Sequence, residues 1–96
     1  MLPKNRLPTH PGEILLEEFL KPLGITQTAF AEHIGVHLPA LSELVRGRRG
    51  VSATMAWRLA RALRTDAEFW MSLQAQYDLA AARGEASSVK PIRKAS

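Results

Sequence analysis

The sequence contains no cysteine and no long apolar run. The lack of cysteine excludes a disulfide framework and any metal site that needs a thiolate ligand. The residues after Met1 are unlike the apolar stretch of a signal peptide. Glu17, Glu18 and Lys21 interrupt the longest apolar run, well short of the ~20 residues that cross a bilayer. We therefore expect a soluble, cytoplasmic protein without a membrane partner.

The motifs on which small enzymes depend are also missing. The chain has no glycine-rich phosphate loop, and 96 residues leave little room for a substrate cleft. Glu17 lies four residues before Lys21, which is the spacing of a surface ion pair and does not indicate a catalytic carboxylate pair. His33 and His37 have the spacing of a helical metal pair, but Gly35 breaks the helix between them. We predict no catalytic residue, no metal site, no cofactor and no enzymatic activity.

Acidic residues are absent from one segment of the chain. Residues 46–64 contain six arginines and no acid, whereas residues 1–45 have three basic and five acidic side chains. Residues 65–85 are acidic again, with four acids and one arginine, and residues 86–96 carry three basic groups. Such an arginine cluster would attract a polyanion more strongly than the net charge of +4 indicates. The alternative is an ordinary solvated helix face.

The length and composition indicate one small domain. A hydrophobic fraction of 46% lies in the globular range, and 96 residues fill a single core. A domain this short buries a limited share of its surface, so we expect a homodimer. We predict an extended N-terminal arm at residues 1–10, a folded domain at 11–83 and a disordered basic tail at 84–96.

Apolar periodicity predicts an all-α domain of five helices and no strand. The expected helices cover about residues 11–21, 27–34, 38–46, 53–63 and 66–83. Pro22 and Gly24 should end the first helix, whose buried face would comprise Leu16, Phe19, Leu20 and Leu23. Thr26, Ser52 and Thr65 are suitable N-cap residues for the second, fourth and fifth helices.

The segment QTAFAEHIGVHLPALSELVR, at about residues 27–46, has the pattern of a helix-turn-helix. Ala31 offers a small contact between the two helices, and Gly35 permits the positive φ of a tight turn. The apolar anchors would be Phe30, Ile34, Val36, Leu41 and Leu44. An ordinary helical hairpin would satisfy the same pattern, but the adjoining arginine cluster favours a DNA-binding role.

Three stretches of this chain resemble a known family. The opening PTHPGEILLEEFLKPLGIT, the turn AEHIGVHLPALSELVRGRRGVS and the ending LRTDAEFWMSLQAQYDL are similar to helix-turn-helix regulators with a lambda-repressor-like fold. HPGE and TDAEFW indicate the HigA-type antitoxins of bacterial toxin–antitoxin modules within that group, and the resemblance covers about residues 8–80. It implies a five-helix homodimer that binds operator DNA, represses its own operon and neutralises a RelE-like ribonuclease toxin.

One face of the second helix of the motif is predicted to enter the major groove. Ser42 could bond either base type, Glu43 could accept from a cytosine amine, and Arg46 is placed for phosphate. The full predicted DNA-binding set is Gln27, Thr28, His37, Leu38, Pro39, Ser42, Glu43, Arg46, Arg48 and Arg49.

The start of that helix departs from the family pattern. Where the family usually has a polar pair, often Ser then Arg, this chain has His37 and Leu38, and Leu38 offers only apolar contact. An alternative is therefore open. The chain could be a protein-interaction module of the same fold, or a stand-alone transcriptional regulator, without a toxin or without tight DNA recognition.

The fifth helix carries an aromatic stripe that we interpret as a dimerisation face. Its members are Phe69, Trp70, Leu73 and Tyr77. They present more apolar surface than a core of this size is expected to absorb. A symmetric dimer would place its two recognition helices about 34 Å apart, one turn of DNA. The alternative is that the stripe closes the protomer's own core.

Overall fold

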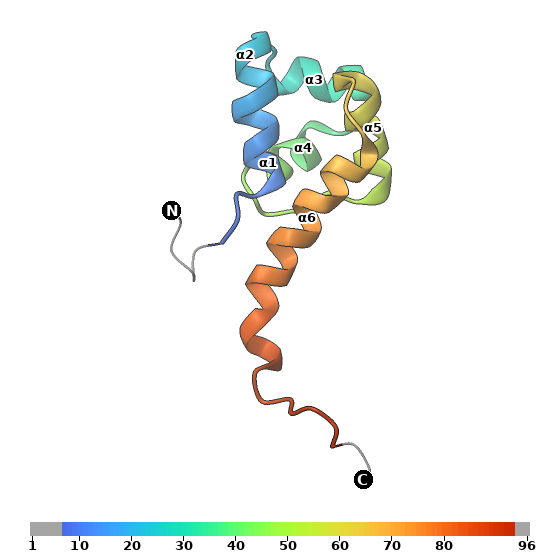
Figure 1. The fold of residues 1–96 in the computed structure, drawn as a ribbon. Coiled ribbons are helices and arrows are strands. Elements are labelled where there is room, and N and C mark those ends of the chain that lie inside the picture. Colours follow the sequence, from blue (N-terminus) through green and yellow to red (C-terminus); the bar gives the residue numbers. More distant parts are fainter. Residues whose placement is uncertain (1–6, 94–96) are drawn as a thin grey trace.

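The computed structural model describes residues 7–93, and its regular elements are all helices (Figure 1). A continuous first helix comprises α1 (Pro11–Ile14), the π-helical η1 (Leu15–Leu20) and α2 (Lys21–Leu23). It is followed by α3 (Gln27–Ile34), α4 (Leu38–Val45), α5 (Ala53–Leu63), α6 (Ala67–Ala82) and the 3-10 helix η2 (Arg83–Ala86). The prediction of an all-α, five-helix domain is confirmed for the part of the chain that the structure describes.

The first helix differs from its prediction at its carboxyl end. It continues through Pro22 to Leu23 and ends at Gly24, which has a φ of 68°. The π-helical η1 precedes Pro22, whose ring lacks an N–H and would clash with the preceding turn of a regular α-helix. A widened turn relieves that conflict, so the proline lies inside the last turn of the helix.

The π-helical turn also changes which leucines are buried. Leu15 and Leu20, five residues apart, are 0% and 1% exposed. Leu16 and Phe19 are only half-buried, and Leu23 is 59% exposed. The prediction of Leu23 as a core residue was therefore wrong, because it assumed regular α-helical spacing.

Two of the three predicted N-caps are confirmed. The side chains of Thr26 and Ser52 each accept a hydrogen bond from the backbone N–H three residues further on, at 3.1 and 3.2 Å. Thr65 is different, because the residue at the N-cap of α6 is Asp66. The Thr65 hydroxyl instead accepts a hydrogen bond from the Trp70 indole N–H at 2.8 Å, which satisfies the polar atom of a buried side chain.

The HPGE segment joins the first helix to α4. His10 caps α1 because its Nδ1 accepts a hydrogen bond from the Gly12 N–H at 2.9 Å, and Pro11 follows at the first helical position. Gly12 lies directly against the backbone of α4: a Cβ atom there would be 1.7 Å from the carbonyl oxygen of Leu44. The start of the domain thus packs on the end of the second helix of the helix-turn-helix.

His10 also connects this junction to α6. Its ring lies edge-on to Tyr77, with ring centroids 4.8 Å apart. Burial lowers the pKa of His10 below its ordinary value, against the opposing influence of Asp78 and Glu13. The neutral imidazole is the form whose Nδ1 can accept the capping hydrogen bond.

The core is apolar, and α6 extends beyond it. Fourteen buried apolar residues from all five helices and the loop before α5 form one cluster, with Trp70 fully buried. In Figure 1 the carboxyl half of α6 projects away from the other helices. No helix within residues 7–93 is long and apolar enough to span a membrane.

The two ends of the chain are described only in part. Residues 7–10 of the predicted N-terminal arm form no helix, and residues 1–6 lie outside the described residues. The predicted tail begins inside η2, and its described residues from 84 to 93 are all exposed. That residues 84–96 form a disordered tail stays a prediction.

Candidate nucleic-acid interface

Helices α3 and α4 form the predicted helix-turn-helix. Gly35 ends α3 with a φ of 73°, and the Val36 N–H donates to the Ala31 carbonyl at 3.0 Å. Ala31 is 2% exposed, as expected of the small residue at the contact between the helices. The predicted anchors Phe30, Ile34, Leu41 and Leu44 are buried, and Val36 is half-buried.

The predicted groove-facing residues lie on the outer surface of α4. His37, at the N-cap, makes no capping hydrogen bond with its side chain. Leu38 is 39% exposed, Ser42 is half-buried, and both lie away from the fully buried Leu41 and Leu44. The exposed members of the set on this surface are His37, Leu38, Pro39, Glu43 and Arg46. The arrangement leaves an exposed helix face with both polar and apolar side chains, and an α-helix can enter a major groove with such a face.

Gln27 and Thr28 form the first turn of α3. Gln27 is half-buried and Thr28 is exposed. Thr26 caps the N–H of Ala29, so the N–H groups of Gln27 and Thr28 have no partner within the helix. Free N–H groups beside a short hydroxyl side chain are suited to a phosphate oxygen.

The loop between α4 and α5, residues 46–52, carries three of the predicted arginines. Arg49 donates from Nε and Nη2 to Oε1 of Glu43, at 3.1 and 2.9 Å. Two residues predicted to contact DNA separately therefore pair with each other. Both are about half-exposed, and such surface pairs are worth at most about 1 kcal/mol, so the pair can open on binding. Arg46 and Arg48 are exposed, and the ion pairs found within residues 7–93 do not involve them.

Gln74 fixes the far end of this loop, and it was not among the predicted residues. Its Oε1 accepts a hydrogen bond from the Val51 N–H at 2.7 Å, and its Nε2 donates to Oδ1 of Asp78 at 2.9 Å. Gly50 lies so close that a Cβ atom there would be 2.9 Å from the Gln74 amide. Gln74 is 9% exposed, so helix α6 holds the arginine-bearing loop through a buried amide.

Replacing Gln74 by alanine should lower the free energy of unfolding by about 1–3 kcal/mol, because the buried Val51 N–H would lose its acceptor. Gln76→Ala, at an exposed position of the same helix, should stay within about 0.5 kcal/mol of the parent. Urea denaturation followed by circular dichroism measures both. Equal stability of the two variants would show that the buried amide does not hold the loop.

The predicted dimerisation stripe lies largely inside the protomer. Trp70 is 0% exposed, with Phe69 and Phe19 packed on its ring. Leu73 is half-buried against the core, and Tyr77 is half-buried against His10. The assignment of Trp70 to an intersubunit surface was wrong, because the domain's own core absorbs its ring. Of the four residues, Phe69 is the most exposed, at 40%.

A different side of α6 is apolar and uncovered. Met71 is 39% exposed and Leu79 is 72% exposed, and Ala75 and Ala82 are exposed as well. Steps of four, four and three residues place these side chains on one face of the helix. We call this set the α6 outer stripe.

The chain is similar to proteins of known family. The helix-turn-helix family model matches residues 16–70. Virulence-associated protein I of Dichelobacter nodosus is 42% identical over 90 residues, which cover 93% of this chain and 83% of that protein. Antitoxin HigA-1 of Vibrio cholerae is 44% identical over 93 residues, covering 92% and 87%.

A solved structure agrees in fold as well. The antitoxin HigA of Pseudomonas aeruginosa, determined with the higBA promoter, superposes with a TM-score of 0.84 and is 42% identical. The match covers 90% of this chain and 99% of that chain. The chain therefore belongs to the helix-turn-helix family and, within it, to the HigA-type antitoxins with a lambda-repressor-like fold.

Proposed function

We propose that this protein is the antitoxin of a type II toxin–antitoxin module. As a homodimer it would bind operator DNA, repress its own operon and neutralise a RelE-like ribonuclease toxin. The observation that carries the proposal is the exposed face of α4 beside a loop that presents Arg46 and Arg48. The promoter complex of the Pseudomonas aeruginosa HigA, which has the same fold, supports it.

On DNA, each part of this surface has its own role. Ser42 and the apolar Leu38 and Pro39 meet base edges, because they lie on the outer face of α4. Arg46 and Arg48 bind phosphates from the end of that helix and the loop. His37 and Glu43 lie in the same groove, and Gln27, Thr28 and Arg49 contact the flanking phosphates. Arg49 exchanges Glu43 for a phosphate when DNA is bound, which leaves Glu43 free to accept from a cytosine amine.

We place the dimer contact on the α6 outer stripe, because it is apolar and exposed and extends into the carboxyl half of α6, which projects from the bundle (Figure 1). A glutamate at Leu79 would bury an unpaired charge in that contact, so Leu79→Glu should shift the protein from dimer to monomer. Val89→Glu makes the same change at a residue that is 74% exposed beyond the helix and should leave the dimer intact. Sedimentation at micromolar concentration would detect the difference. If the Leu79→Glu variant remained a dimer, the dimer contact would lie on another surface.

We expect the toxin to bind away from α4. A basic ribonuclease should seek acidic surface, and the exposed acids Glu13, Glu17 and Glu18 lie on the first helix. The double variant Ser42→Ala with Arg46→Ala should therefore lose operator binding and still co-purify with the toxin encoded beside its gene. Loss of toxin capture by this variant, with its circular dichroism unchanged, would refute the separation of the two surfaces. If no toxin gene adjoined it, the stand-alone regulator would be the better description.

A further inference from the structure

A groove runs between α3 and α5, and its basic end at Arg58 borders a hollow that His37 and Arg49 of the predicted DNA surface also line. One part of it is a hollow of about 250 Å³ lined by apolar side chains from three segments. The lining residues of this apolar hollow are Leu23, Ile25, Ala29, Phe30, His33, Ala62 and Leu63. Leu23 is the exposed leucine that the π-helical turn displaces from the core, and it stands at the edge of the hollow.

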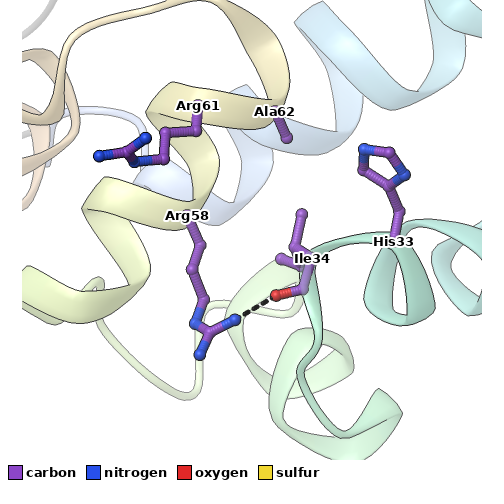
Figure 2. A pocket seen from close by; sticks show the side chains of 5 residues that line it. All are labelled: His33, Ile34, Arg58, Arg61 and Ala62. Carbon is purple, nitrogen blue, oxygen red and sulfur yellow. Dashed lines mark hydrogen bonds between the residues drawn. The ribbon is translucent and has the colours of Figure 1, made fainter.

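The second part is a basic hollow of about 270 Å³ that adjoins the first. It is lined by His33, Ile34, Arg58, Arg61 and Ala62. His33 and Ala62 line both hollows, so the two hollows adjoin at these side chains. Figure 2 shows His33 projecting from α3, and Arg58 and Arg61 projecting from α5.

The charge of the groove has one sign. None of its lining residues is acidic, and α5 has no acidic residue over its whole length. One guanidinium nitrogen of Arg58 donates to the Ile34 carbonyl at the end of α3 (Figure 2). A guanidinium has five N–H donors, so this bond fixes Arg58 in place and leaves donors for a ligand. Arg61 is exposed.

We infer that this groove binds a peptide segment of a partner protein that has one large apolar side chain next to carboxylates. The apolar hollow takes the side chain, and Arg58 and Arg61 pair with the carboxylates. Because the two hollows adjoin, a peptide can place one side chain in each of them. Nucleic acid fits less well, because a phosphate backbone gains nothing from an apolar hollow.

The protein's own ends do not have this chemistry. Residues 86–96 contain three basic groups and no acid, and residues 1–10 contain Lys4 and Arg6 and no acid. Either end would be repelled by Arg58 and Arg61. Charge complementarity therefore points to another protein as the occupant.

The test is selection of random 12-residue peptides displayed on phage against the full-length protein. Enriched peptides should combine at least two acids with a leucine or an aromatic residue. Their affinity should fall at least tenfold for Arg61→Glu and for Leu23→Ser. Arg83→Glu and Val89→Ser make comparable changes at exposed positions outside both the groove and the α6 outer stripe, and they should leave binding unchanged.

Three results would overturn the inference. The first is that no peptide is enriched over the starting library. The second is that selected peptides bind the groove variants and the control variants equally well. The third is that a stoichiometric non-operator duplex displaces the bound peptide. The last result would assign the groove to nucleic acid. Operator affinity is measured on the same variants. Arg61→Glu and Arg83→Glu should have the same operator affinity. Loss of peptide binding by Arg61→Glu alone is therefore distinguishable from a failure of the DNA-binding proposal.

Discussion

Replacing Gly12 by alanine is expected to destabilise the domain by at least about 3 kcal/mol, the upper end of the range for overpacking. The new Cβ would lie 1.7 Å from the Leu44 carbonyl oxygen and 3.1 Å from the Val45 Cα, and both are backbone atoms of the α4 region. No side chain can move aside to make room, so α1 and α4 would have to separate. A domain of this size has roughly 5–15 kcal/mol of stability, so the loss is a large share of the total.

The melting temperature measures this effect. Each 1 kcal/mol shifts it by about 4–8 °C in a domain of 60–100 residues, so Gly12→Ala should lower it by at least roughly 12 °C. Gly84→Ala is the matched control, because nothing lies within 4 Å of a Cβ atom at that position. It should change the stability by no more than about 0.5 kcal/mol. Similar melting temperatures for the two variants would contradict the close packing of the first helix on α4.

The second large effect is expected on DNA affinity. Arg46 and Arg48 are exposed at the end of α4 and in the following loop, where a side chain reaches phosphate more easily than a base edge. Removing one phosphate contact lowers the slope of log affinity against log salt by about 0.9. Arg46→Ala with Arg48→Ala removes four arginines from a homodimer on its operator, so it should flatten the slope by roughly 3.6. The loss should be the same on any duplex, because phosphate contacts carry no base sequence.

Arg61→Ala with Arg83→Ala removes the same charge from positions outside the α4 surface and should leave the slope nearly unchanged. Arg49→Ala should have a smaller effect than Arg48→Ala, because Arg49 already has Glu43 as a partner in the free protein. Binding titrations over a salt series provide all four values. An unchanged slope in the Arg46 and Arg48 variant would identify these side chains as ordinary solvated surface.

The helix-turn-helix could be predicted because its determinants are local. Thr26 and Ser52 cap helices through bonds that span three residues, and Gly35 provides the positive φ of the turn within the motif itself. Each of these features depends on a few neighbouring residues, so the residue types and their spacing were sufficient.

The features that were missed depend on contacts between distant parts of the chain. Gln74 binds the N–H of Val51, 23 residues away, and a glutamine in a helix gives no local signal of such a bond. Trp70 was placed on the surface, because helical spacing alone does not show how much apolar area a core absorbs. The pairing of Arg49 with Glu43 spans six residues and requires the loop to turn back on α4.

The π-helical turn is a missed feature of another kind. Its signal, Pro22 inside an apolar helical pattern, was present in the sequence and was interpreted as the end of the helix. The helix nevertheless continues through the proline to Leu23, and the turn ahead of it widens to allow this. The register of Leu15 and Leu20 follows from that adjustment.

We propose that the outer face of α4 reads a specific DNA sequence, and fluorescence anisotropy with two duplexes measures whether it does. One duplex comes from the region upstream of the protein's own gene, and the other is the same sequence scrambled. The protein should bind the first at least about 10³-fold more tightly. Ser42→Ala should lose about 1–3 kcal/mol on the first duplex and almost nothing on the second, with the salt slope unchanged. Equal affinity of the parent protein for both duplexes, or equal weakening of both by Ser42→Ala, would contradict the claim and favour a protein-interaction module of the same fold.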